Sequence, residues 1–216
     1  MIYIFVDFEM NKIDDSHKEE LEICKNEIIE IGAVKLDDDY KETDAFKTYV
    51  KPQISSIDAK ITKLTGITDD MVKDAPTFAP AITAFMDWCD GADVIYAWSE
   101  NDLRQMNKEI KLKGYTYEKT EVVAGKWKDF QKEFGRKLGI RRRIALSDAV
   151  FYLGEDFQGN EHDALWDARN TAEVFVLSKD EEKFEKTMAP IVNAYKPKEV
   201  LTYSIGNLFA NIKIDP

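Results

Sequence analysis

The start of the chain constrains the fold most, because an unbroken apolar run from Ile2 to Val6 leads directly into Asp7 and Glu9. Five apolar residues without polar alternation predict a strand covered on both faces, as in a sheet packed between helices. Side chains alternate along a strand, so Asp7 and Glu9 point to the same face. Two buried carboxylates side by side are costly unless a cation or a donor compensates them. The sequence therefore predicts a positive partner at this place.

Length and composition indicate one folded domain with an appended tail, since 216 residues with 44% hydrophobic content can bury a substantial core. The amino terminus lacks the pattern of a secretory leader, and no apolar stretch approaches membrane-spanning length. We therefore expect a cytoplasmic protein with no membrane partner. The two cysteines, Cys24 and Cys89, suggest neither a disulfide framework nor a ligand cluster.

The net charge of −11 argues against broad, nonspecific coating of nucleic acid, which draws on Lys and Arg. It does not exclude a small metal-assisted site. Carboxylates that hold divalent cations add to the negative count, whereas the cations that reverse the local charge do not appear in a sequence.

The pattern along the chain predicts an antiparallel meander followed by alternating helices and strands, hence an α/β layered fold around a mixed sheet. Charged residues 11–26 are interpreted as an exposed insertion. The predicted strands are 2–10, 27–36, 44–52, 92–99 and 121–125. The predicted helices are 55–66, 77–91, 99–112, 126–139, 145–154 and 162–179. From about residue 180, a further helix and the stretch VLTYSIGNLFANI have no role that the sequence indicates.

Two further acids stand where predicted elements begin: Asp102 in the first turn after strand 92–99, and Asp167 five residues after His162. Divalent cations such as Mg²⁺ prefer oxygen ligands, so carboxylates that converge at one edge of a sheet suit them. Two such metals roughly 4 Å apart support phosphodiester cleavage. A neutral histidine nearby can accept the proton of the attacking water.

The ordered motifs DFE, EIIEIGAV, LTGIT, Asp102 after a strand, and HDALWDA resemble those of the DnaQ-like 3′-to-5′ exonucleases of the DEDDh group. The resemblance spans residues 1 to about 178. It implies a ribonuclease H-like three-layer fold, with a mixed five-stranded sheet flanked by helices, over 1–178. Residues 179–216 are then a C-terminal helical extension of unknown role.

The resemblance also implies a role for each site residue. Asp7 would bridge two divalent cations, Mg²⁺ or Mn²⁺, Glu9 and Asp167 would complete the ligands of the first, and Asp102 would serve the second through water. His162 would be the general base. Members that use tyrosine as the base place it four residues before the last aspartate, where this chain has Asp163.

The same resemblance nominates residues that contact the terminal nucleotide: Leu64 and Thr65 of LTGI, together with Phe8 and Met10. The long stretch between DFEM and EIIEIGAV, with DARNTA after the histidine, resembles Eri-type and KapD-like members, many of which act on RNA. The implied function is release of nucleoside monophosphates from single-stranded 3′ ends, and RNA is favoured over DNA as the substrate. A DNA proofreading or repair exonuclease is the alternative, and an inactive nucleic-acid-binding scaffold that uses 179–216 for a protein partner is a third reading.

Each site residue also has a simpler interpretation. Asp7 and Glu9 would be the solvent-facing end of a strand, Ser99 and Asp102 would form a helix capping box, and Asp167 would pair with Arg169. His17, the other histidine, is interpreted as a solvated loop residue.

The basic stretch KWKDFQKEFGRKLGIRRR has two interpretations as well. Its aromatic residues fall on one side of the predicted helix, where core packing is the simpler role. The loop Arg141 to Arg143 is either a solvated face or a phosphate contact. The stripe of the predicted helix consists of Trp127, Phe130, Phe134 and Leu138.

Overall fold

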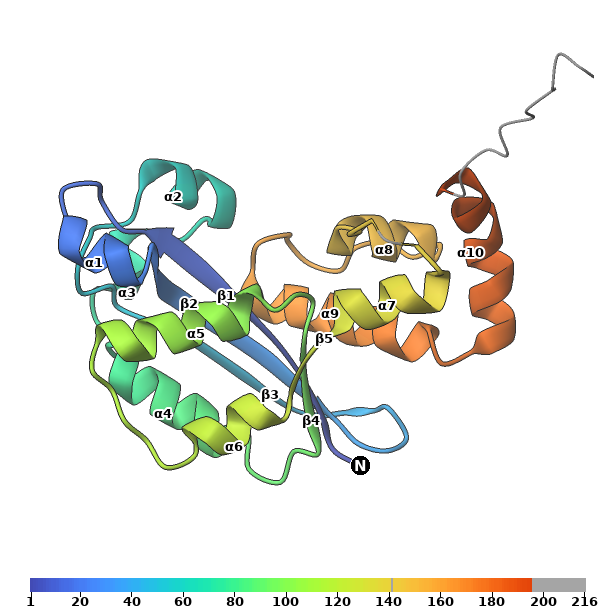
Figure 1. The fold of residues 1–216 in the computed structure, drawn as a ribbon, viewed down its shortest axis with the longest axis horizontal. Helices are drawn as coiled ribbons and strands as arrows, with labels where there is room; N and C mark the ends of the chain where they lie inside the picture. The colour runs from blue at the N-terminus through green and yellow to red at the C-terminus, as the bar shows by residue number, and fades with distance from the viewer. Residues whose placement is uncertain (141, 196–216) are drawn as a thin grey trace, which may run out of the picture.

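A computed structural model describes residues 1–140 and 142–195 of the chain. Its strands form one mixed sheet in the order β3-β2-β1-β4-β5, with β1 in the centre (Figure 1). The β1–β2 and β2–β3 pairs are antiparallel, and the β1–β4 and β4–β5 pairs are parallel. The strands are β1 (Tyr3–Lys12), β2 (Asn26–Leu36), β3 (Glu42–Tyr49), β4 (Val94–Ala97) and β5 (Trp127–Asp129). The predicted mixed five-stranded sheet is confirmed.

Helices cover both faces of this sheet. The helices are α1 (Lys18–Ile23), α2 (Ala59–Thr65), α3 (Asp69–Val72), α4 (Phe78–Trp88), α5 (Asn101–Leu112), α6 (Thr120–Gly125), α7 (Phe130–Leu138), α8 (Leu146–Tyr152), α9 (Ala164–Leu177) and α10 (Glu181–Tyr195). None of the helices within the described ranges is both long and apolar enough to cross a bilayer.

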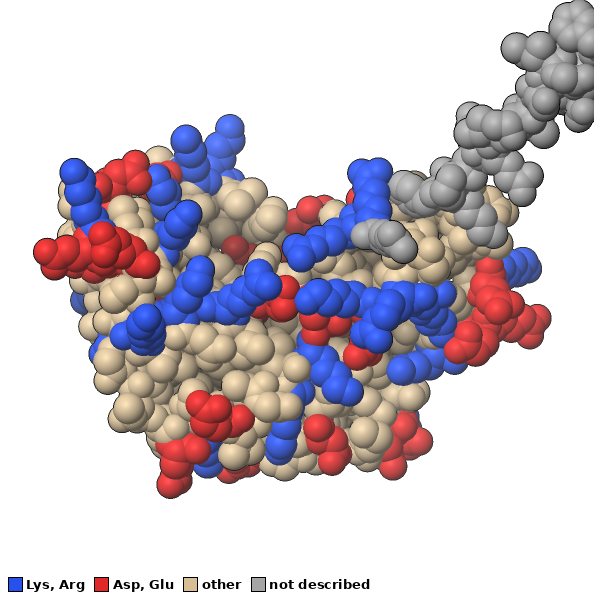
Figure 2. Space-filling model, in the orientation of Figure 1, with Lys and Arg blue, Asp and Glu red and all other residues tan. Residues whose placement is uncertain are grey.

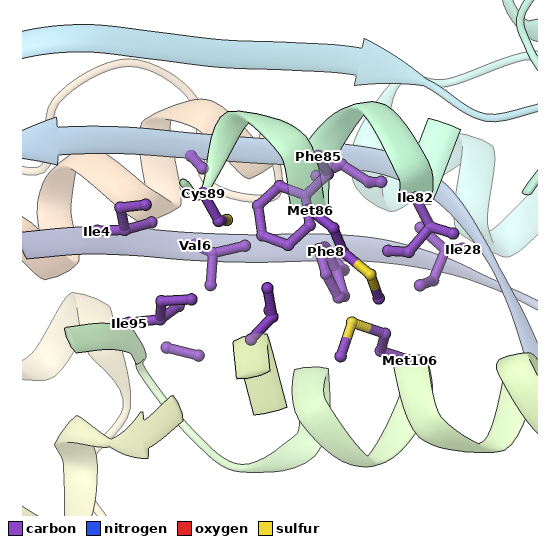
Figure 3. Packing of buried hydrophobic residues seen from close by; sticks show 14 of the residues in the cluster. Ile4, Val6, Phe8, Ile28, Ile82, Phe85, Met86, Cys89, Ile95 and Met106 are labelled. Atoms are coloured by element: carbon purple, nitrogen blue, oxygen red, sulfur yellow. The ribbon is translucent and has the colours of Figure 1, made fainter. Parts of the chain in front are cut away.

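Alternate residues of β1 belong to two separate hydrophobic cores. Ile4, Val6 and Phe8 enter the first core, where they pack against α4, α5 and α6 (Figure 3). Phe5 faces the opposite way and joins the second core with residues of α7, α8, α9 and α10. Since side chains alternate along a strand, Asp7 and Glu9 continue the row of Phe5. The two acids therefore lie on the face that α9 covers.

The segment 120–139 differs from its prediction. Residues 121–125 lie in helix α6 and not in a strand, and the fifth strand is β5, where Trp127 pairs with Ile95. Val122 is exposed in this helix. Its β-branched side chain, which is typical of strands, therefore does not pack against the sheet. Helix α7 starts at Phe130, with Asp129 as its cap accepting a hydrogen bond from the Lys132 N–H at 2.8 Å.

The predicted apolar stripe of that helix is therefore divided between the two cores. Trp127 belongs to the first core, on the other side of the sheet from Phe130, Phe134 and Leu138 in the second. Periodicity alone could not separate a strand residue from the helix that follows it directly.

The predicted insertion 11–26 is more ordered than an exposed loop. Strand β1 continues to Lys12, Ile13 is fully buried, and residues 18–23 form α1. Cys24 and Cys89 are both buried free thiols, in agreement with the absence of a disulfide framework.

The first part of the predicted extension 179–216 packs on the second core. Phe184 and Met188 of α10 are buried there, beside α7 and α8. The stretch VLTYSIGNLFANI lies outside the described residues.

Candidate active site

The acids Asp7 and Glu9 lie inside β1, at the point where its parallel neighbour ends. Pairing with β4 stops at Val6, opposite Ala97, whereas pairing with β2 continues to Lys12. Beyond Val6, the β4 side of β1 therefore has backbone groups that no strand satisfies. The predicted first strand, with both acids in it, is confirmed, and β1 extends beyond them to Lys12.

Asp102 fills this gap beside β1. Helix α5 begins at Asn101, and the Oδ1 atom of Asp102 accepts a hydrogen bond from the Phe8 N–H at 3.1 Å. The capping box predicted from Ser99 and Asp102 is not formed, because the Asp102 carboxylate is turned to β1 and buried. Ser99 instead accepts a hydrogen bond from the Asn101 N–H at 3.2 Å. The carboxylate thus reaches the strand that carries Asp7 and Glu9.

His162 and Asp167 approach the same acids from the start of α9. His162 has a left-handed backbone with φ of 66°, a conformation that costs free energy in non-glycine residues. In this conformation its N–H donates to Oδ2 of Asp167 at 3.2 Å, and its Nδ1 lies 4.0 Å from Oε1 of Glu9. The His162 side chain keeps 43% of its surface exposed. A ring placed this way is open to solvent while it faces the acids.

Asp167 does not make the surface pair considered for it. Arg169 instead pairs with Glu42, with 2.8 Å between Nη2 of the arginine and Oε1 of the glutamate. Oδ1 of Asp167 is buried with no hydrogen-bond partner among the described residues. Unsatisfied buried polar atoms are rare in folded proteins and point to a missing ligand.

The donor set fits a divalent cation. One ligand atom each from Glu9, His162 and Asp167 lies within 4.8 Å of the others. Two ionised carboxylates at that separation repel by roughly 3 kcal/mol at an effective dielectric constant of 20. Oxygen-rich clusters of this kind are what Mg²⁺ and Mn²⁺ prefer. The orphaned Asp167 oxygen and the crowded carboxylates are thus both explained by a cation.

The pKa values of the site acids show how strongly the protein alone disfavours their charge. Burial, followed by repulsion from Asp102, Asp167 and Glu9, raises the pKa of Asp7 well above its usual range. Burial, with repulsion from neighbouring acids, also raises the pKa of Glu9 to about 8 and those of Asp102 and Asp167 to about 7. Near neutral pH the four groups cannot all ionise cheaply without a compensating charge.

Gly32 allows α9 to reach the two strand acids. It lies opposite Asp7 in the β1–β2 ladder. A Cβ atom at this position would lie 2.1 Å from the Leu165 nitrogen and 2.2 Å from the Ala164 carbonyl carbon. Helix α9 therefore packs with its first turn directly on the backbone of β2, and this approach carries His162 and Asp167 to β1.

Glu30 and Lys47 hold the helix start in this place. Glu30, opposite Glu9 in the ladder and 2% exposed, accepts a hydrogen bond from the Ala164 N–H at 3.0 Å. Lys47 on β3 pairs with Glu30 at 3.0 Å and with Asp163, the cap of α9, at 2.6 Å. The lysine thus compensates a fifth buried acid and ties it to the residue after His162.

Sequence reasoning missed Gly32, Glu30 and Lys47 as contributors to the site. Glu30 and Gly32 share one parity in EIIEIGAV, which places both on one face of the predicted strand. That parity was the available signal, but the face could be matched to Asp7 and Glu9 only once the register was known. Lys47 carries no signal in a single sequence.

The residues nominated for nucleotide contact occupy different environments. The Phe8 side chain is 4% exposed and packs edge-on against Phe85 and Trp127 in the first core. Met10 is half-buried at the rim of that core, just past a β-bulge. Leu64, at the end of α2, is 52% exposed.

Helix α2, which carries Leu64 and Thr65, is fastened to the far end of β1. The Asn11 side chain accepts a hydrogen bond from the Asp58 N–H at 2.9 Å and donates one to the Ser56 carbonyl at 3.0 Å. Thr65 Oγ1 donates to the Ile61 carbonyl and accepts from the Ile67 N–H, which fixes the end of the helix. Figure 2 shows the surface indented between the α2 and α8 ends of the molecule, with acidic atoms visible there.

Comparison with known proteins shows the family to which the chain belongs. A family model described as Exonuclease (RNase_T) matches residues 4–175. The chain is 34% identical over 177 residues to the PolC-type DNA polymerase III of Caldanaerobacter subterraneus, covering 81% of this chain and 12% of the polymerase. It is 30% identical over 159 residues to human 3′-5′ exoribonuclease 1, covering 70% of this chain and 46% of that protein. The chain thus spans less than half the length of these two relatives.

A solved structure has a similar fold. The nuclease domain of 3′hExo, described as a DEDDh family member bound to rAMP, superposes with a TM-score of 0.71 at 26% identity. The match covers 83% of this chain and 92% of that domain. The chain therefore has a fold similar to that of this nuclease domain.

Replacing Gly32 by Ala tests the close approach of α9 to β2. The added Cβ collides with backbone atoms, so we expect the free energy of unfolding to fall by about 3 kcal/mol or more and Tm to fall by roughly 5 to 10 °C. The control is Gly125→Ala, where a Cβ meets no atom within 4 Å. Thermal unfolding by circular dichroism measures both, and equal Tm values for the two variants would contradict the packing described.

The raised pKa values predict how stability depends on pH in metal-free protein. A carboxyl whose pKa is higher when folded contributes stability below its unfolded value, and this stability is lost as pH rises through its folded value. With folded values of about 7 to 8 for Glu9, Asp102 and Asp167, Tm in EDTA should fall between pH 5.5 and 8.5. Saturating Mg²⁺ should reduce that fall. A Tm that is flat or rises over this range in EDTA would count against the charge repulsion.

Proposed function

Because the chain belongs to the exonuclease family whose model matches residues 4–175, within the DnaQ-like DEDDh group, we propose that it is a metal-dependent 3′-to-5′ exonuclease. The observation that carries the proposal is the convergence of Asp7, Glu9, Asp102, His162 and Asp167 at one edge of β1. Its substrates are single-stranded 3′ ends, and it releases nucleoside monophosphates. A scaffold without catalysis has no use for such a costly group of acids.

Asp7, Glu9, Asp102 and Asp167 would hold two divalent cations, Mg²⁺ or Mn²⁺, at the proposed site. When bound, such cations supply charge stabilisation for the phosphoryl oxygens and lower the pKa of a coordinated water. The positive charge of the cations would also offset the repulsion between the four carboxylates and allow them to ionise. The orphaned Oδ1 of Asp167 supports this assignment.

The residues of the chain supply the remaining steps. His162 accepts the proton of the attacking water as the water oxygen bonds to phosphorus and the bond from phosphorus to the 3′ oxygen breaks. The products are a nucleoside 5′-monophosphate and a strand one nucleotide shorter with a free 3′ hydroxyl. Phe8, Met10, Leu64 and Thr65 are proposed to contact the terminal nucleotide, and the exposure of Leu64 is consistent with that role.

RNA is the proposed natural substrate. The supporting observation is the match to 3′hExo, whose nuclease domain is described as bound to rAMP, together with the match to 3′-5′ exoribonuclease 1. The 34% identity with a PolC-type DNA polymerase favours a second candidate, a DNA proofreading or repair exonuclease.

Substitution of the proposed base and of the bridging acid tests the mechanism. His162→Ala should lower the turnover of 5′-labelled RNA about 10²- to 10⁴-fold, the usual contribution of a general base, and Asp7→Asn should lower it at least as much. The matched control is His17→Ala, which changes the other histidine of the chain. Gel analysis should give a ladder shortened from the 3′ end that EDTA abolishes. Wild-type rates in either site variant, with Tm retained, would refute the mechanism.

The choice of sugar is tested with matched RNA and DNA oligonucleotides and with RNA that carries a single 2′-deoxynucleotide at its 3′ end. We expect a higher kcat/KM on RNA and a loss on the terminally substituted strand, because the 2′-hydroxyl is the group that distinguishes the two sugars. Equal or faster digestion of DNA would favour the proofreading or repair alternative.

A further inference from the structure

A cavity beside α7 gathers positive charge outside the acid cluster. It measures about 540 Å³ and is lined by Gln131, Lys132, Gly135, Arg136, Ile140, Arg142 and Arg143. Four of these residues are cationic, and none of the described lining residues is acidic. The chain as a whole has a net charge of −11, so a cavity lined only by neutral and cationic residues differs in charge from the average of the sequence. Arg141, which was also considered for phosphate contact, lies outside the described residues.

We propose that this cavity, called the α7 cavity below, binds a backbone phosphate of the nucleic-acid strand, upstream of the nucleotide that is released. The inference rests on the proposed exonuclease function and adds to it a second, sequence-independent contact with the substrate. Arginine and lysine side chains are the usual partners of phosphate, and arginine can bind it through two parallel hydrogen bonds.

The α7 cavity adjoins the acid cluster through Glu100. Nζ of Lys132 lies 2.9 Å from Oε2 of Glu100, two residues before Asp102, and 3.3 Å from Asp129. Both Lys132 and Glu100 are partly exposed, and exposed pairs contribute about 1 kcal/mol or less. A substrate phosphate can therefore take the place of Glu100 at little cost.

The interaction is with phosphate and not with bases. Phe130 and Phe134, the aromatic residues of α7, are buried in the second core and offer no ring for base stacking. Figure 2 shows Lys and Arg side chains continuing over the α5 and α7 face, and Lys108 and Lys111 of α5 are exposed. A strand that leaves the acid cluster along this face would meet these cations, and the buried rings of Phe130 and Phe134 would not stack on its bases.

The test replaces two exposed cations of the cavity and compares them with two exposed lysines elsewhere. Arg136→Gln/Arg143→Gln removes two charges from the α7 cavity, and Lys41→Gln/Lys73→Gln removes two charges from distant surface turns. Binding of a fluorescent 12-nucleotide RNA is measured by anisotropy in an Asp7→Asn background, so that the strand is not consumed. Kd is recorded from 50 to 300 mM NaCl.

We expect the cavity variant to raise Kd about tenfold at 50 mM NaCl and to reduce the slope of log Kd against log salt by about 0.7 for each phosphate that the variant no longer binds. The control variant should keep the wild-type slope. With Asp7 restored, the cavity variant should also lose most of the preference for a 12-mer over a dinucleotide in kcat/KM. A change confined to overall folding would lower the rates on both substrates alike.

Equal slopes for the two variants, or an equal loss on dinucleotide and 12-mer, would overturn the inference while the wild-type enzyme remains active. Failure of the wild-type enzyme to shorten any oligonucleotide in Mg²⁺ or Mn²⁺ would count against the proposed function itself. The two failures are therefore distinguished by the activity of the unmodified chain.

Discussion

Repulsion between buried carboxylates is the constraint on which the rest of this structure depends. Asp7, Glu9, Asp102 and Asp167 come from three separate segments and share one poorly solvated place, where burial first and the charges of neighbouring acids second raise their pKa values. Such a group of buried acids lowers the stability of the fold, so stability alone does not account for its presence. The cost is explained if cations occupy the site, and such cations would also stabilise the charge that develops in phosphodiester hydrolysis.

Three features of the fold bring these acids together. The β1–β4 pairing ends at Val6, which leaves the Phe8 N–H for Asp102 to bind. The missing side chain of Gly32 lets α9 lie against β2. Glu30 and Lys47 then fix the start of that helix through Ala164 and Asp163, close to His162.

Sequence reasoning predicted the parts of this arrangement that depend on local pattern. The alternation in DFE placed Asp7 and Glu9 on one face, and the hairpins and crossovers gave the mixed sheet. It failed where pairing between residues far apart in the sequence decides the structure. Val122 has a side chain typical of strands but lies in a helix, because Trp127 pairs with Ile95 in the sheet. Lys47 and Gly32 acquire their roles only through the register of β2 with its two neighbours.

Calorimetric titration of Mn²⁺ into the metal-free chain at pH 7.5 tests the central claim most directly. We predict binding of two ions per chain, with release of protons from the acids whose pKa values are raised, and the disappearance of this binding in Asp7→Asn. A chain that binds no Mn²⁺, or whose stoichiometry and proton release are unchanged by Asp7→Asn, would contradict this prediction.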